Sequence, residues 1–320
     1  FGFCKAHAAA FAMPTYQSAW LKTHYPAAFF SGVLTHDPGM YPKRLIVDEV
    51  RQMGIAIAPL DVNASDSAYR VEDHGNAIRI ALSTVAGISD AEVQSIIAGR
   101  PYIDLNDFVR RSGSSTPVTE SMILTGAFDS LHIDVNRRDL LLHFSELQKS
   151  PGRAVSGAQM NLGFDPPALI SSGLPAMSAA ESVKYEVDRL GIDMSRHMIE
   201  FYGDFLNAIG AVRSSDLLKQ RSQSSVLVAG IKVAMQTPPV RSGKRVIFVT
   251  LDDGYGLSDS TFFTDVQGEY ANVLYSTSLL LVRGITRRTG ARGISIRATG
   301  AWDLRAAYES WSTKQSTLAI

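Results

Sequence analysis

The chain has 320 residues, of which 45% are hydrophobic and 19% charged, a composition typical of folded globular domains. Its 31 basic and 31 acidic residues cancel, and a single cysteine, Cys4, excludes a disulfide framework. The single cysteine fits a reducing cytosol, no apolar run reaches the ~18 residues of a membrane span, and no signal-peptide pattern is present. The chain begins at Phe1 inside an apparent helix, and we expect it to be a piece of a longer protein.

The first segment, residues 5–53, is expected to be helical. Pro26 and Pro42 can each start a helix at its first turn, and the later helix should end before Gly54. Pro14 lies inside the first Ala-rich stretch. Because a proline in a helix interior costs about 3 kcal/mol or more, the pattern predicts a break or kink at that position.

Two cationic candidates, Lys5 and His7, stand at the start of this first helix. The helix dipole favours anions there, so both side chains are candidates for binding phosphate oxygens. A capped helix with side chains that reach into solvent is the alternative.

The next segments, IAIAP (55–59) and AIRIAL (77–82), predict short strands that flank the connection DVNASDSAYRVE (61–72). Several short helices are expected between residues 90 and 147.

The stretch VAGISDAEVQSIIAGR (85–100) has the layout of a helix-hairpin-helix motif. A turn built on Gly87 presents N–H groups, and the following helix N-terminus can hold a DNA phosphate without reading bases. Ser89 stands where the favoured pattern has a second glycine, and it can instead cap the helix. A purely structural helix pair is the alternative.

Residues 148–176 are rich in Pro, Gly and Ser and read as a linker, and residues 177–222 read as a helical connector. Five alternating segments then predict a small β-barrel: 226–235, 245–253, 260–266, 279–286 and 293–300. The predicted fold class is multidomain α+β. The expected domains are 1–60, 61–147 (helix-hairpin-helix), linker 148–176, connector 177–222, barrel 223–304 and a C-terminal tail 305–320.

The charge is unevenly distributed in the barrel segment, because residues 270–302 contain no acidic residue. The arginines of this stretch are Arg283, Arg287, Arg288, Arg292 and Arg297. A stretch of one sign fits a surface that follows a phosphate backbone. A solvated strand edge kept from aggregating by its charge fits equally well.

The barrel segment resembles an OB-fold, whose open face commonly stacks bases on aromatic residues beside basic ones. The candidates for stacking are Phe248, Tyr255, Phe262 and Phe263. A barrel this small needs most of its aromatics for its core, so each is expected there first. Asp252 and Asp253 fit a turn better than a metal site.

Residues 2–34, GFCKAHAAAFAMPTYQSAWLKTHYPAAFFSGVL, resemble the fingers segment of bacterial C-family DNA polymerases, the polymerase III α subunit and its relatives. In that family, GF-x-K-x-H-A precedes Y-Q-x-x-W-L-K-x-H-x-P. The helix-hairpin-helix region and an OB-fold ending in WDL (302–304) follow in the same order. Ala6 and the segments 35–55 and 173–181 resemble the error-prone, damage-inducible translesion branch (ImuC-type).

The resemblance implies the C-terminal portion of a DNA-directed DNA polymerase. Lys5 and His7 would contact the dNTP triphosphate, supported by Tyr16, Gln17 and Lys22. Mg²⁺ would be bound in the full-length enzyme by palm carboxylates outside this chain, so this portion alone should be inactive and bind no metal. Template-primer duplex and single-stranded DNA are the implied partners. A non-catalytic DNA-binding accessory protein built from the same modules is the alternative.

A last candidate lies in the linker, where QMNLGF (159–164) fits the spacing of bacterial sliding-clamp ligands. Gln159, Leu162 and Phe164 would enter a hydrophobic groove of the clamp, and a flexible tether makes even a weak contact useful. Recruitment through an error-prone-repair partner protein, or packing of the linker on a neighbouring domain, are the alternatives.

Overall fold

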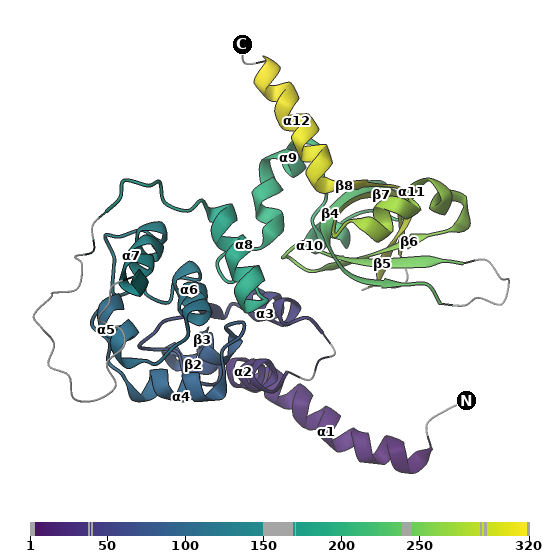
Figure 1. The fold of residues 1–320 in the computed structure, drawn as a ribbon. Coiled ribbons are helices and arrows are strands. Elements are labelled where there is room, and N and C mark those ends of the chain that lie inside the picture. The colour runs from purple at the N-terminus through teal and green to yellow at the C-terminus, as the bar shows by residue number, and fades with distance from the viewer. Residues whose placement is uncertain are drawn as a thin grey trace, which may run out of the picture. The chain divides into compact units, whose positions relative to one another are not determined.

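The computed structural model describes residues 4–37, 39, 41–149, 169, 171–238, 245–288, 290 and 293–318. The chain divides into two compact units, Phe1–Ser195 and Arg196–Ile320 (Figure 1), and each is described by itself. Among the described residues, no helix combines the length and the apolarity that a bilayer crossing needs.

The first unit begins with the helices α1 (Lys5–His24), α2 (Pro26–His36) and α3 (Lys43–Gln52). Pro26 occupies the first turn of α2 as predicted, and α3 starts one residue after Pro42. The predicted break at Pro14 is wrong, because α1 continues through that residue. The proline removes one backbone hydrogen bond, but the surrounding alanines are strong helix formers and the turns on both sides keep their own bonds.

A small sheet follows, made of β1 (Ala56–Ala58), β2 (Arg70–Glu72) and β3 (Ala77–Arg79) in the order β1-β3-β2. The two predicted strands are confirmed. The connection between them was wrongly expected to lack a strand, because β2 pairs antiparallel with β3 and places Val71 opposite Ile78. Three residues are too few to show a period of two, so only the pairing partner reveals this strand.

The rest of this unit is helical: α4 (Asp90–Ala98), α5 (Leu105–Arg111), α6 (Thr116–Leu124), α7 (Arg137–Lys149) and α8 (Ala179–Leu190). The predicted short helices between residues 90 and 147 are therefore confirmed. Phe108 anchors their core, with edge-to-face contacts to Tyr102 and Phe128 at ring-centroid distances of 5.0 and 4.9 Å. One continuous hydrophobic core runs from Ala27 in α2 to Met194.

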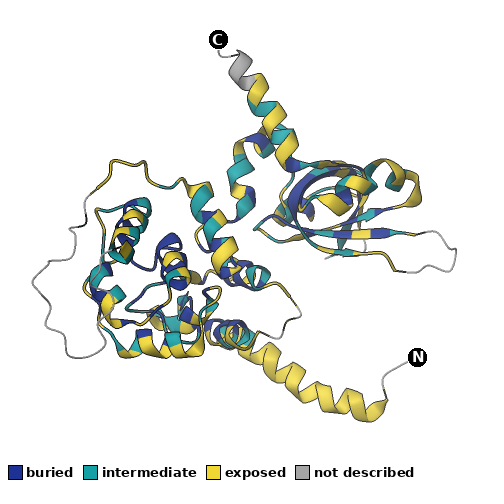
Figure 2. Ribbon diagram, viewed as in Figure 1, coloured by how far each residue is buried: buried dark blue, intermediate teal, exposed yellow. Residues whose placement is uncertain are grey.

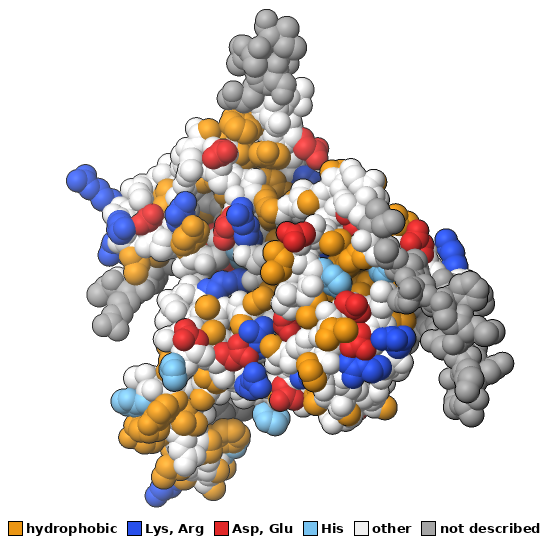
Figure 3. Space-filling view, turned by 90° about the vertical axis from the view of Figure 1, so that its left-hand side faces the viewer, with side chains coloured by type: hydrophobic (Ala, Val, Ile, Leu, Met, Phe, Trp, Pro, Cys, Tyr) orange, Lys and Arg blue, Asp and Glu red, His pale blue; other side chains and the backbone are white. Residues whose placement is uncertain are grey.

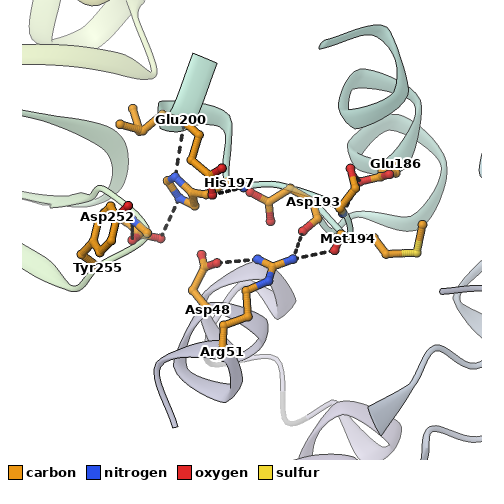
Figure 4. Close-up of polar contacts among 12 residues, drawn as sticks. Asp48, Arg51, Glu186, Asp193, Met194, His197, Glu200, Asp252 and Tyr255 are labelled. Atoms are coloured by element: carbon orange, nitrogen blue, oxygen red, sulfur yellow. Dashed lines mark hydrogen bonds and ion pairs between the residues drawn. The ribbon is translucent and has the colours of Figure 1, made fainter. Parts of the chain in front are cut away.

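The end of this unit is fastened to α3 by one arginine (Figure 4). The Arg51 guanidinium donates to the carbonyl oxygens of Asp193 and Met194, the latter at 2.8 Å, and pairs with the buried Asp48 carboxylate at 2.8 Å. Because Asp48 is 3% exposed, this pair neutralises a carboxylate that would otherwise be costly to bury.

The second unit starts with short helical turns, η4 (Met198–Tyr202), α9 (Gly203–Ala208) and α10 (Ser214–Leu217). Its strands are β4 (Ser225–Gln236), β5 (Ile247–Asp252), β6 (Leu257–Phe262), β7 (Leu279–Arg288) and β8 (Ile294–Asp303). They close into a barrel in the order β4-β5-β6-β8-β7, with α11 (Thr264–Ser276) between β6 and β7. This is the arrangement of an OB-fold, so the predicted barrel and the α+β class are confirmed.

One sequence prediction for this unit is wrong in detail. The segment 260–266 was expected to be one strand, but β6 ends at Phe262 and α11 begins at Thr264. No secondary structure was predicted for the tail 305–320, in which the structure has the helix α12 (Leu304–Leu318). This helix has an apolar partner: Phe205 contacts the rings of Tyr308 and Trp311 at 5.9 and 5.5 Å.

The barrel is covered unevenly on its outside (Figure 2). Its interior holds residues such as Val228, Val249 and Phe262. A second apolar cluster lies outside the barrel over β4 and the start of β7, and it includes Ile199, Phe205, Ala229, Ile231, Leu279, Leu281 and Leu304. The outward side chains of β5, β6, β8 and the rest of β7 remain the accessible barrel surface.

Candidate nucleic-acid interface

The predicted triphosphate ligands lie at the exposed start of α1. Cys4 caps this helix, and its Sγ accepts a hydrogen bond from the His7 backbone N–H at 3.4 Å. Lys5 and His7 are both exposed, and the His7 ring lies 4.6 Å from that of Phe11. Residues two apart point to different sides of a helix, so the two side chains leave the start of α1 in different directions.

The predicted supporting residues of α1 divide into two groups. Tyr16 and Gln17 line a shallow depression of about 370 Å³ together with Trp20 and Leu21. Lys22 instead forms an ion pair with Glu49 of α3, and its ammonium lies 5.6 Å from the ring centroid of Phe30 in α2. Lys22 therefore holds α1 against its neighbours, which is a packing role.

The predicted hairpin turn has the expected backbone geometry. Gly87 has φ = +81°, a conformation that favours glycine, and Ser89 is the N-cap of α4. The Ser89 side chain accepts from the Glu92 N–H at 3.3 Å, and Glu92 returns the contact by accepting from the Ser89 N–H at 2.9 Å. The structure thus shows the capping role of Ser89 directly.

Glu92 also reaches the next hairpin. Its second carboxylate oxygen accepts from the N–H of Ser115, the N-cap of α6, at 2.9 Å. These backbone donors, Ser115 first and Ser89 second, lower the pKa of Glu92 to about 2. One internal carboxylate therefore occupies amide groups at the start of two helices. A DNA phosphate cannot accept from the Ser89 N–H while Glu92 holds it.

Sequence analysis missed Glu92 and the second hairpin, in which Gly113 has φ = +66°. The signal for Glu92 was present, because S-x-x-E at 89–92 is the capping-box pattern. The contact with Ser115 could not be found that way, since it depends on how α4 and α6 pack.

Replacing Glu92 by Ala is expected to lower the free energy of unfolding by about 1–2 kcal/mol at pH 7, because two helix starts lose an acceptor. The folded-state pKa lies below the usual 4.5, so this stabilisation is present above pH 4.5 and is lost as the pH falls toward 2. Urea unfolding between pH 7 and pH 3 measures it. Glu120→Ala, at an exposed position of α6, is the control; equal losses in the two variants would contradict the double-cap role.

The described arginines of the barrel make different contacts. Arg288 donates to the backbone carbonyl of Leu218, which commits it to packing. Arg283 lies over the Trp302 ring at 5.3 Å from its centroid, and Arg287 is exposed. Arg292 lies outside the described residues.

Arg297 occupies the centre of the open barrel surface. The strand register aligns it with Thr261 of β6 and Ile285 of β7, and Thr261 with Phe248 of β5. Its guanidinium lies 5.6 Å from the ring centroid of Phe263 and 3.0 Å from the Asp265 carboxylate. The surface formed by Phe248, Phe263, Arg297 and Ile285 is called the β5–β8 face below.

The aromatic candidates separate by exposure. Phe262 is fully buried in the barrel core, as expected, whereas Phe248, Tyr255 and Phe263 are 43%, 47% and 38% exposed. The expectation that each would fill the core is therefore wrong for these three. Phe248 points outward because it alternates with the inward residues Ile247 and Val249.

Asp252 and Asp253 belong to a turn, as the sequence indicated. Asp252 accepts from the Gly254 N–H at 3.0 Å, and Asp253 accepts from the Tyr255 N–H at 3.0 Å. The buried His197 lies beside this turn, with its Nε2 3.5 Å from Asp252 Oδ2 and its backbone N–H directed at Glu200 (Figure 4).

Two other histidines have structural contacts with α5. His132, in the segment before α7, accepts through Nε2 from the Leu105 N–H at 3.1 Å, and His143 of α7 has its Nε2 2.7 Å from Asn106 Oδ1. Burial lowers the pKa of both rings, which favours their neutral form.

Charge of both signs is spread over the face shown in Figure 3. Figure 3 shows Lys and Arg side chains intermingled with Asp and Glu on the face that it presents. On that face, basic and acidic side chains are therefore not separated into one large basic and one large acidic surface.

Several known proteins are similar to this chain in sequence. A family model described as a helix-hairpin-helix motif matches residues 54–140. An error-prone DNA polymerase of Symbiobacterium thermophilum is 32% identical over 343 residues, which cover 92% of this chain and 31% of that protein. One from Bdellovibrio bacteriovorus is 30% identical, covering 91% and 29%. The DNA polymerase III subunit alpha of Vibrio cholerae is 28% identical, covering 98% and 28%.

A helix-hairpin-helix unit and an OB-type barrel follow one another in this chain, and nearly all of its length is similar to bacterial DNA polymerases. The relatives matched in this way are error-prone DNA polymerases and DNA polymerase III α subunits. The chain spans less than a third of the length of these relatives.

Proposed function

We propose that this chain is the DNA-handling portion of an error-prone, translesion DNA-directed DNA polymerase that acts in repair of damaged DNA. The observation that carries the proposal is the 32% identity to an error-prone polymerase across 92% of the chain. The order of modules supports it, since fingers-like helices, a helix-hairpin-helix unit and an OB-type barrel follow one another.

The three modules have different tasks in this proposal. Lys5 and His7 contact the dNTP triphosphate at the start of α1, where the helix dipole also favours negative charge. The helix-hairpin-helix unit grips the template-primer duplex through backbone N–H groups of its turns, including those at Gly87 and Gly113. The β5–β8 face binds single-stranded DNA by stacking bases on Phe248 and Phe263 beside Arg297.

The chemistry of nucleotide addition lies in the longer polymerase. Mg²⁺ held there by carboxylates outside this chain supplies activation of the primer 3′-hydroxyl and stabilisation of the leaving pyrophosphate. The residues of this chain position dNTP and DNA. A sliding clamp or a repair partner completes the proposed set of partners. The candidate clamp ligand, Gln159, Leu162 and Phe164, lies outside the described residues.

Binding of this chain to single-stranded DNA should depend steeply on salt, with a slope of about 0.7 in log K against log [salt] for each phosphate neutralised. Changing Arg283, Arg287 and Arg297 together to Gln is expected to lower the slope by about 2. Fluorescence anisotropy of a labelled oligonucleotide between about 50 and 300 mM salt measures both, since the Debye length falls about 2.5-fold over this range. Arg305→Gln, at an exposed position of α12, is the control.

Primer extension separates the polymerase from the accessory-protein alternative. The chain alone should incorporate no nucleotide, whereas the longer gene product that contains it should extend a primer. DNA binding without incorporation by that longer product would favour the non-catalytic accessory protein.

A further inference from the structure

The second unit contains a pocket that the proposed single-strand surface does not use. Its volume is about 240 Å³, and it lies between η4, α9 and the turn that joins β5 to β6. The floor is apolar and consists of Ile199, Leu206, Val212 and Ala229. Ala229 is buried on β4, and the Val212 N–H donates to the Leu227 carbonyl of that strand at 2.7 Å. The floor therefore rests on the barrel itself.

A cation–π pair, Arg213 and Tyr255, lies at the edge of this pocket. The guanidinium carbon of Arg213 lies 4.4 Å from the ring centroid of Tyr255, and both side chains are exposed. Planar guanidinium and aromatic groups are the surfaces on which proteins stack unpaired bases.

The rim is held in place by one buried carboxylate. Asp253 is 8% exposed and accepts from the Ser214 N–H at 2.7 Å and from the Tyr255 N–H at 3.0 Å. Asp253 thereby fixes the backbone of Ser214, which follows Arg213, and the backbone of Tyr255. A stacking pair that is ordered before a ligand arrives loses less conformational entropy on binding.

Two further polar side chains line the same pocket. Asn207 is exposed on α9, and Glu200 is exposed on η4, where its Oε1 also receives the His197 backbone N–H at 3.4 Å. An amide can donate and accept, whereas an ionised carboxylate accepts only. The pocket thus combines an apolar floor, a stacking rim and an acceptor that favours an N–H₂ group.

We propose that this pocket binds one unpaired nucleobase that carries an exocyclic amino group, such as cytosine, inserted from a single strand of DNA. The base stacks on the Arg213–Tyr255 pair, its amino group donates to Glu200, and Arg213 also faces the neighbouring phosphate. Carboxylates read cytosine in this way through its N4 amino group. The proposal rests on the proposed single-strand binding by this unit and adds a second site to it.

The test uses the whole chain and a short oligonucleotide that carries one 5-iododeoxycytidine, which crosslinks to an adjacent aromatic ring on irradiation. Mass spectrometry is expected to find the crosslink on Tyr255. Arg213→Ala should reduce the yield at Tyr255 several-fold without changing any crosslink at Phe248.

Base preference gives a second measurement by anisotropy. Oligo-dC should bind about 5-fold or more tightly than oligo-dT of the same length, and Glu200→Ala, which removes the acceptor, should abolish that difference. Glu309→Ala, at an exposed position of α12, should leave it unchanged.

The outcomes distinguish the two proposals. Binding with crosslinks confined to Phe248 or Phe263 would overturn the pocket and leave the β5–β8 face as the DNA site. Equal affinity for the two oligonucleotides would overturn the role of Glu200 in base selection. No binding of either oligonucleotide would overturn single-strand binding by this unit, and the pocket proposal with it.

Discussion

Replacing Lys5 and His7 together by Ala in the longer polymerase is expected to lower kcat/KM for dNTP about 100-fold or more, the usual cost of removing a charge-stabilising donor. The triphosphate carries charge in the ground state and gains more on the leaving pyrophosphate. Both KM and kcat should therefore change. Single-turnover incorporation of one nucleotide across a range of dNTP concentrations separates the two effects.

His24→Ala provides the matched control for this experiment, because it removes an exposed histidine from the opposite end of the same helix. Its kinetics should stay within about twofold of the parent enzyme, an effect too small to reflect a lost catalytic contact. If the Lys5 and His7 variant behaves like the control, the two residues only begin and solubilise α1.

Phe262→Ala is expected to destabilise the second unit by about 3–5 kcal/mol, a large part of the stability of a small domain. Phe262 is fully buried among the inward residues of the barrel, where truncation leaves a cavity. Phe248→Ala, on the neighbouring strand, removes the same ring from an exposed position and should cost about 0.5 kcal/mol or less. Hydrogen exchange of peptides from β4 to β8 in urea follows this unit separately.

The same pair should show the reverse order in DNA binding. Phe248→Ala should weaken single-strand binding by about 1–3 kcal/mol, because a stacking platform is lost. Phe262→Ala should bind normally under conditions where the barrel remains folded. Full binding by the Phe248 variant would remove this residue from the proposed face.

Local signals in the sequence predicted much of the fold. Prolines at helix starts predicted α2 and α3. Alternating apolar residues, divided by turn residues, predicted the five barrel strands. The failures are places where a distant partner decides the structure. Strand β2 exists through its pairing with β3, and α12 through its contacts with Phe205.

The candidate site was likewise predictable only where local sequence signals determine the structure. Gly87 and Ser89 have the backbone roles that their residue types suggested. The arginine stretch could not be resolved from the sequence, because Arg288 turns to a backbone carbonyl while Arg297 joins an aromatic ring. The Arg213–Tyr255 stack depends on a turn and a loop far apart in the chain, and no local pattern indicates such a contact.

The closure of the barrel is unequal around its circumference. Among the described residues, two parallel register pairs join β6 and β8, Ser260 with Ile296 and Thr261 with Arg297, whereas β7 and β8 are aligned from Leu280 to Arg288. Partial opening of a barrel proceeds where the fewest bonds must break. A DNA strand lying on both Phe248 and Arg297 would cross this seam, so it would clamp the barrel shut, and part of its binding energy would appear as rigidity of the protein.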